Sequence, residues 1–217
     1  MKLFNFIKRY IPKRRTYVYV ALGDSTVEGV GASAPHRSYT GILHTIVKER
    51  KKNTSYYNLG VAGATLRDVL DTQVAKAIEL QPDLVTLSVG ANDIKNRTNS
   101  TTFSKELRLL FKELQTKTNA KIIVNTIPDL SLTPAIPRYL KSYSKFMAIR
   151  FNATITRVGE ELSIPIVDLF NYSRSIIRQF PEAIASDGFH PSDFGYAIWA
   201  NTMIPHIHKV TSSKKIL

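Results

Sequence analysis

Short apolar runs alternate with longer segments of helical periodicity along most of the chain. Five runs rich in β-branched and apolar residues predict strands, at residues 17–22, 55–59, 84–89, 121–126 and 164–168. Helical segments are expected at about residues 39–51, 66–80, 103–118 and 139–162, followed by pieces near 172–180 and from Ser192 onward. Strands that alternate with crossover helices form parallel sheets. The pattern therefore predicts an α/β fold, a three-layer α/β/α sandwich with a five-stranded parallel sheet.

Local signals refine these elements. Residues 103–118 carry one apolar stripe at a period of 3.6, typical of a helix packed on a sheet. Thr65 and Asp68 have the spacing of a capping box, which places a helix start there. The run at residues 55–59 is more polar than the other four, which favours a position near the sheet edge. Pro205 is expected to kink or end the last helix.

Neither an internal repeat nor a linker divides the main pattern. We expect a basic amphipathic arm at residues 1–15, a single domain at 16–210 and a basic tail at 211–217. The chain has 217 residues, 43% of them hydrophobic, which is enough to bury one core. The absence of Cys excludes disulfides, thiolate metal sites and cysteine nucleophiles, so the candidate nucleophiles are Ser, Thr, Lys and carboxylates.

Nearly half of the net charge of +13 lies at the N-terminus, because residues 1–15 carry +6 and the rest of the chain carries +7. Residues 1–15 hold basic side chains without any acid, and Leu3, Ile7 and Ile11 recur at helical spacing among them. Two interpretations stand: a solvated leader, or a helix through residues 2–15 that lies on an anionic membrane surface. No pattern typical of a nucleic-acid-binding fold follows the arm, so we expect no nucleic acid partner.

Targeting signals are not evident. Basic residues interrupt every apolar run of the arm, unlike the continuous core of a signal peptide, and no window approaches 18 apolar residues. We therefore predict a cytoplasmic protein without a transmembrane helix, whose membrane contact, if the arm provides one, is peripheral.

Chemically specific residues follow the predicted strands. Strand one runs into Gly23-Asp24-Ser25-Thr26, strand two into a loop containing Gly60 and Gly63, and strand three into Gly90-Ala91-Asn92-Asp93, while Asp187-Gly188-Phe189-His190-Pro191 stands near the C-terminus. Ligand sites of open parallel sheets lie beyond the carboxyl ends of the strands. We expect these segments to meet there.

Together the segments supply the groups that acyl transfer requires. Ser25 is the candidate nucleophile on a tight turn, His190 the general base, and Asp187 the carboxylate that orients the imidazole. The candidate oxyanion donors are the backbone N–H groups of Ser25 and Gly63 and the side-chain amide of Asn92. Asp24 and Asp93 are expected to bond nearby backbone groups rather than to act as catalytic acids.

These blocks, in this order, resemble the SGNH hydrolases, also called GDSL esterases and lipases. The resemblance spans roughly residues 17–204 and falls on Ser25, Gly63, Asn92 and His190, with Asp187 as third member of the triad. It implies a flavodoxin-like SGNH hydrolase fold and a serine ester hydrolase that works through an acyl-enzyme. Thr26 departs from the leucine common in the family, and we expect it to alter a pocket wall without removing catalysis.

The sequence does not specify the substrate. A small-molecule or lipid-like acyl ester is expected, and carbohydrate O-deacetylase, thioesterase and lysophospholipase activities would use the same groups. The alternative from another class of function is a non-catalytic lipid- or anion-binding module. Ser25, Asp187 and His190 argue against it, because a binding module does not need a base beside a hydroxyl. The remaining histidines lack ligand spacing with carboxylates, and the Gly-Val-Gly that follows Glu28 lacks the third glycine of a dinucleotide loop, so neither metal nor cofactor is expected.

Overall fold

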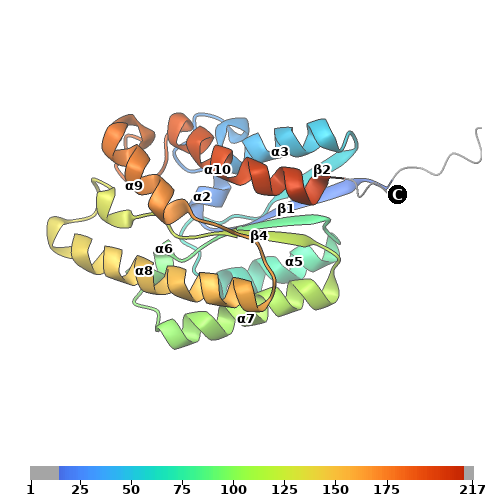
Figure 1. The fold of residues 1–217 in the computed structure, drawn as a ribbon, viewed down its shortest axis with the longest axis horizontal. Coiled ribbons are helices and arrows are strands. Elements are labelled where there is room, and N and C mark those ends of the chain that lie inside the picture. Colours follow the sequence, from blue (N-terminus) through green and yellow to red (C-terminus); the bar gives the residue numbers. More distant parts are fainter. Residues whose placement is uncertain (1–14, 213–217) are drawn as a thin grey trace, which may run out of the picture.

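Five parallel strands form the central layer, in the order β2-β1-β3-β4-β5 (Figure 1). The computed structural model describes residues 15–212. The strands are β1 (Tyr17–Gly23), β2 (Thr54–Asn58), β3 (Leu84–Ser88), β4 (Lys121–Asn125) and β5 (Ile166–Val167). This is the strand order of flavodoxin-like folds, with a switch in winding direction between β1 and β3. The predicted fold class is confirmed, and the polar strand β2 lies at an edge as expected.

Helices cover both faces of the sheet (Figure 1). One face is covered by α3 (Tyr39–Arg50) and α10 (Asp193–Thr211), and the other by α4 (Leu66–Asp68), α5 (Val74–Glu79), α7 (Ser100–Lys117) and α8 (Arg138–Glu161). Shorter elements gather near the carboxyl ends of the strands: α2 (Ser25–Glu28), η1 (Pro35–Arg37), α6 (Ala91–Lys95), η3 (Leu130–Leu132), α9 (Leu169–Gln179) and η4 (Pro181–Ala183).

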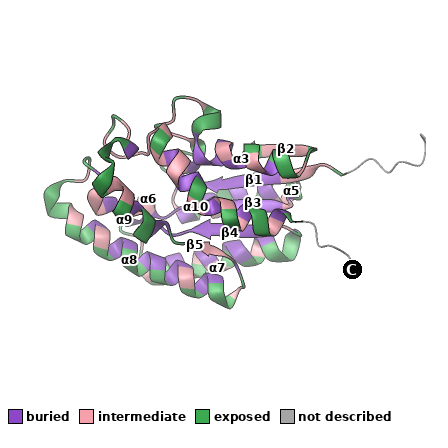
Figure 2. Cartoon of the chain, turned by 45° about the horizontal axis from the view of Figure 1, so that its top comes forward, coloured by how far each residue is buried: buried purple, intermediate pink, exposed green. Residues whose placement is uncertain are grey.

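Strand β1 divides the core into two halves because its successive side chains point to opposite faces. Val20 and Leu22 join the apolar cluster beneath α7 and α8, whereas Tyr19 and Ala21 join the cluster beneath α3 and α10. All four side chains are fully buried, and the central strands appear as a continuous buried layer in Figure 2. Burial on both faces explains why the sequence of this strand is apolar without alternation.

Three predicted elements differ in detail. The helix predicted at residues 66–80 contains a π-helical turn, η2 (Val69–Gln73), between α4 and α5. Strand β5 is shorter than predicted because the Ile164 N–H bonds back to Gly159 and Pro165 has no N–H to offer. The following helix starts earlier than predicted, at Leu169, because the Asp168 carboxylate accepts a hydrogen bond from the Asn171 N–H at 3.0 Å.

Helix α10 does not end at Pro205 but continues to Thr211. A proline leaves the carbonyl four residues earlier without its helical donor. Here that carbonyl belongs to Asn201, which is exposed, as is Pro205, so water can hydrogen-bond it. The free-energy cost of the missing hydrogen bond is therefore smaller on this exposed face than inside the protein, and the helix can continue past Pro205.

Both ends of the described segment are tied to the domain. Arg15 pairs with Asp83 at 3.2 Å, and Arg50 Nε donates to Thr211 Oγ1 at 2.8 Å. The predicted arm falls on residues 1–15, of which all but Arg15 lie outside the described residues, as do the last residues of the tail. Within residues 15–212, none of the helices has the length and apolar character needed to span a bilayer.

Packing beneath α8 can be tested with two phenylalanines of that helix. Phe151 is fully buried and stacks on Phe103 with ring centroids 4.3 Å apart, whereas Phe146 is exposed. Phe151→Ala should lower the free energy of unfolding by about 3–5 kcal/mol because it leaves a cavity. Phe146→Ala should change it by less than about 0.5 kcal/mol. Urea denaturation measures both, and equal losses would contradict this account of the core.

Candidate active site

The turn after β1 depends on the absence of a side chain at Gly23. Its φ is +145°, and a Cβ there would lie 1.9 Å from the Ser88 carbonyl oxygen of β3. Asp24 then caps α2, since its Oδ1 accepts hydrogen bonds from the Thr26 N–H at 2.9 Å and the Thr26 hydroxyl at 2.8 Å. Asp24 thus bonds the local backbone, as predicted. Ser25 becomes the first residue of α2 and is 8% exposed.

Gln73 fixes this turn from the π-helical segment η2. Its amide Nε2 donates to the Gly23 carbonyl at 2.8 Å, and its Oε1 accepts from the Gly23 N–H at 2.9 Å. The side chain is buried, so both bonds form away from competing water. A π-helical turn shifts the helix register and frees side chains for such contacts. Sequence reasoning did not identify Gln73, because the pattern of residues 66–80 predicts an ordinary helix.

The segment that carries His190 is held by backbone hydrogen bonds on both sides. Ala185 N–H donates to the His190 carbonyl at 2.8 Å, and Ala135 N–H donates to the Gly188 carbonyl at 3.0 Å. On the other side, Gly31 packs so closely that a Cβ would lie 2.5 Å from the Pro191 carbonyl oxygen. These contacts place His190 beside Ser25 although the two residues are 165 positions apart.

Ser25, His190 and Asp187 form one hydrogen-bonded chain. His190 Nε2 lies 2.9 Å from Ser25 Oγ, and His190 Nδ1 lies 2.5 Å from Asp187 Oδ2. Asp187 Oδ1 also accepts hydrogen bonds from the N–H groups of Phe189 and His190. Burial disfavours the charged carboxylate, but these hydrogen bonds outweigh it and hold the pKa of Asp187 below its usual range. The structure thus brings together all three predicted triad residues.

The predicted oxyanion donors come from three places in the fold: the start of α2, the loop between β2 and α4, and α6. Gly63 has a φ of +84° and lies on an exposed loop with open space around it. The Asn92 side chain, on α6, donates to the Ala64 carbonyl at 3.0 Å, which leaves its second amide hydrogen available. Within residues 15–212, the backbone N–H groups of Ser25 and Gly63 have no hydrogen-bond acceptor.

The loop that carries Gly63 is clamped from two directions. Glu28 of α2 accepts a hydrogen bond from the Ala62 N–H at 2.6 Å, and Asp93 Oδ2 of α6 accepts one from the Leu66 N–H at 2.9 Å. The loop is therefore coupled to both the Ser25 turn and the Asn92 turn. Glu28 was not predicted, and Asp93 bonds backbone as predicted, although that backbone belongs to a different element.

An apolar groove leads away from Asn92. We call it the Asn92 groove; it is lined by Ala91, Asn92, Ile94, Lys95, Arg97, Leu130, Ile136, Leu140, Tyr143, Ser144 and Phe189. A second, almost wholly apolar pocket lies between α9, α10 and the strand ends, bounded by the neighbours of Ser25 and His190 and by residues such as Ile176, Ile198 and Trp199. Thr26 lines this second pocket, in agreement with its predicted place in a pocket wall.

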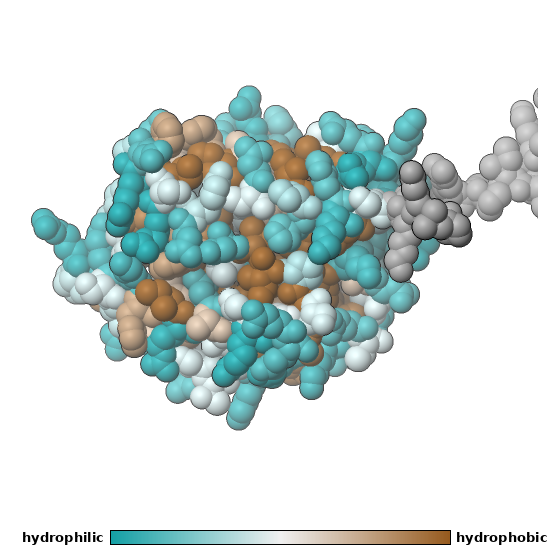
Figure 3. Space-filling model, viewed as in Figure 1, coloured by the Kyte–Doolittle hydropathy of each residue, from teal (hydrophilic) through white to brown (hydrophobic). Residues whose placement is uncertain are grey.

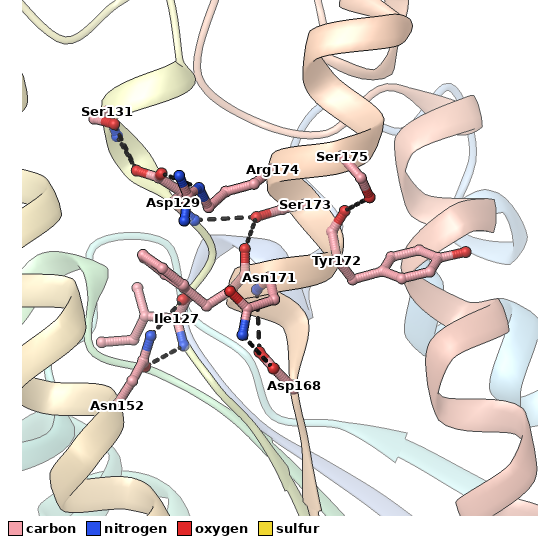
Figure 4. A network of polar contacts seen from close by, with 11 residues as sticks. Ile127, Asp129, Ser131, Asn152, Asp168, Asn171, Tyr172, Ser173, Arg174 and Ser175 are labelled. Carbon is pink, nitrogen blue, oxygen red and sulfur yellow. Dashed lines mark hydrogen bonds and ion pairs between the residues drawn. The ribbon is translucent and has the colours of Figure 1, made fainter.

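Polar contacts fix the wall shared by the groove and the pocket (Figure 4). The Asn152 amide of α8 bonds both the N–H of Ile127, at 2.7 Å, and its carbonyl, at 2.9 Å. Ser173 of α9 accepts from the Asp129 N–H at 3.1 Å, and Arg174 pairs with the Asp129 carboxylate at 3.4 Å. The segment after β4 is therefore anchored to two helices instead of extending into solvent as an irregular loop. No sequence motif marks these partners.

The fold and the site define the class of protein. The profile of the GDSL-like Lipase/Acylhydrolase family matches residues 21–198, and the chain therefore belongs to this family. The resemblance to the SGNH hydrolases is confirmed by this match.

Two relatives are similar in sequence. A GDSL-like esterase of Mycobacterium tuberculosis is 27% identical over 195 residues, which cover 88% of this chain and 62% of the relative. An acetylxylan esterase of Geobacillus stearothermophilus is 25% identical over 156 residues, which cover 69% of this chain and 70% of the relative. The chain thus spans less than two thirds of the length of the mycobacterial relative.

Solved structures share the fold. A lipase/acylhydrolase from Enterococcus faecalis superposes with a TM-score of 0.73 at 21% identity, covering 89% of this chain and 96% of that chain. An acetyl xylan esterase from Geobacillus stearothermophilus superposes with a TM-score of 0.71 at 19% identity, covering 88% of this chain and 94% of that chain.

The buried carboxyl of Asp93 leads to a testable dependence of stability on pH. Burial raises its pKa from 3.8 to about 6, so the folded state binds this proton more tightly than the unfolded state. The stability that the protonated Asp93 carboxyl contributes is therefore fully present below about pH 4 and is lost as the pH rises through about 6. Asp93→Asn should gain stability relative to the parent protein by on the order of 2–3 kcal/mol between pH 4 and pH 7.

Urea denaturation at the two pH values measures this difference. Glu79→Gln, at an exposed position of α5, is the matched control and should show no such gain. A constant difference between Asp93→Asn and the parent protein across this pH range would contradict the assignment.

Proposed function

We propose that this protein is a serine ester hydrolase that cleaves carboxylic esters through an acyl-enzyme. The observation that carries the proposal is the position of the His190 imidazole, 2.9 Å from the Ser25 hydroxyl on one side and 2.5 Å from the Asp187 carboxylate on the other. A hydroxyl is a weak nucleophile unless a base takes its proton, and such a chain supplies that base. Membership of the GDSL-like family and the two esterase relatives support the same reaction.

The reaction follows from the roles of these groups. Ser25 Oγ attacks the ester carbonyl while His190 Nε2 accepts its proton, and the carbonyl oxygen becomes an oxyanion. The donors for that oxyanion are the N–H groups of Ser25 and Gly63 and the Asn92 amide. His190 then returns the proton to the leaving alcohol, and a water molecule, deprotonated by His190, releases the acid and restores Ser25.

The Asn92 groove favours an ester with an apolar acyl group. Most of its lining side chains are apolar, and Asn92, whose amide would hold the oxyanion, is among them. Sugar O-deacetylation is the second candidate, because one relative is an acetylxylan esterase. A panel of p-nitrophenyl esters of increasing chain length, assayed beside acetylated xylan, separates the two: preference for longer acyl groups supports the first, and selective release of acetate from xylan supports the second.

Replacement of the proposed nucleophile gives the most direct test. Ser25→Ala should reduce the rate of ester hydrolysis by about 10⁴-fold or more with little effect on folding. Ser142→Ala, an exposed serine on α8, is the control and should keep full activity. A fluorophosphonate should add to Ser25 with loss of fluoride, detected by peptide mass spectrometry. Full activity or unchanged labelling in Ser25→Ala would refute the proposal.

The oxyanion role of Asn92 requires a different signature. Asn92→Ala should lower kcat by about 100- to 1,000-fold and leave KM nearly unchanged, because the amide meets a charge present only in the transition state. Steady-state kinetics on a soluble ester give both constants. If only KM changes, Asn92 binds the substrate without stabilising the oxyanion.

A further inference from the structure

Helix α8 presents aromatic side chains on its outer face. Tyr139 is 82% exposed, Tyr143 39% and Phe146 55%. Their spacing of four and three residues places them in one stripe along the helix, and Arg150 continues it with its guanidinium 5.6 Å from the Phe146 ring centroid. The outer face of a helix packed on a sheet is normally polar. This stripe therefore requires a specific explanation.

The charge around the stripe is of one sign. Between Arg138 and Arg150, the part of the helix that bears the stripe, there are four basic residues and no acidic one: Arg138, Lys141, Lys145 and Arg150. The neighbouring helix α6 and the turn after it add Lys95 and Arg97, both exposed. Aromatic side chains surrounded by basic ones are suited to an anionic lipid surface, where rings enter the interface and cations contact the headgroups.

The stripe adjoins the entrance of the Asn92 groove. Tyr143 belongs to both, since it is part of the stripe and lines the groove together with Leu140, Lys95 and Arg97. The first half of α8 lies beside α6 at the same end of the molecule as the strand ends (Figure 1). Apolar and charged side chains intermingle over much of the molecular surface in Figure 3. The first half of α8 differs because an aromatic stripe, basic residues and a groove occur together there.

We propose that α8 docks this protein on an anionic lipid surface and thereby presents the Asn92 groove to acyl esters held there. This inference rests on the proposed ester hydrolysis and extends it to the physical state of the substrate. A neutral polysaccharide would also stack on aromatic rings, but it would gain nothing from the basic residues around them. A membrane gains from both, because apolar transfer and electrostatic attraction add.

The test compares exposed apolar residues on two helices of the full-length protein. Tyr139→Ser/Phe146→Ser removes two rings of the stripe, and neither residue lines the Asn92 groove. Leu109→Ser, 46% exposed on α7, is the matched control. Unchanged melting temperatures establish that both variants fold. Sedimentation with vesicles of equimolar phosphatidylglycerol and phosphatidylcholine measures binding, and pure phosphatidylcholine vesicles provide the neutral comparison.

The double variant should bind anionic vesicles at least about tenfold more weakly than the parent protein. This loss is expected because two rings that would enter the lipid interface are removed. Leu109→Ser should bind as the parent protein does, and binding should weaken with salt and be much weaker on neutral vesicles. Turnover of p-nitrophenyl acetate should be unchanged in the double variant, whereas turnover of an ester carried in anionic vesicles should fall with binding.

Three results would overturn the docking surface: equal vesicle binding by the double variant and the parent protein, equal losses in the double variant and Leu109→Ser, or a stripe-dependent binding to neutral xylan. A separate variant tests the charge without altering a residue that contacts the rings: Lys141→Gln/Lys145→Gln should also weaken binding to anionic vesicles, and unchanged binding would overturn the role of charge. Vesicle binding of Ser25→Ala separates this inference from the proposed hydrolysis, since docking should persist in that variant even though turnover is lost.

Discussion

The close approach of β1 and β3 at Gly23 and Ser88 is the constraint on which the site depends. No residue with a side chain fits there, because a Cβ at Gly23 would overlap the Ser88 carbonyl. The approach allows the chain to turn directly over the end of β3, where the Asp24 N–H donates to the Ser88 carbonyl at 3.3 Å. Since β1 and β3 flank the point where the sheet changes winding direction, the crossover helices diverge and leave this edge open.

Hydrogen bonds to the backbone hold the candidate catalytic groups in position relative to one another. Gln73 holds Gly23, while Glu28 and Asp93 hold the two sides of the Gly63 loop. Each side chain comes from one element and bonds the main chain of another, so displacement of one turn would break contacts with its neighbours. A geometry of this kind is already organised before substrate arrives, which is what electrostatic stabilisation of an oxyanion requires.

The two halves of the candidate site are built differently. The Ser25–His190–Asp187 chain is held almost entirely by backbone turns and buried partners. The Asn92 groove, by contrast, is bounded by side chains of α6 and α8, including exposed Lys95, Arg97 and Tyr143. In the proposed reaction, the hydrogen-bonded chain would carry out the chemistry and the side-chain walls would select the substrate. This separation is consistent with one fold serving esterases with different substrates.

The sequence by itself determined the layers, the parallel sheet and the identity of the candidate catalytic residues. Apolar runs and helical periods are local properties, and glycine-containing turns after the strands mark the carboxyl edge. Only the tertiary structure decided the roles of Gln73 and Asn152, the π-helical turn and the continuation of α10 beyond Pro205. These features depend on contacts between residues far apart in the chain and on the access of water to particular carbonyl groups. A local sequence pattern contains neither kind of information.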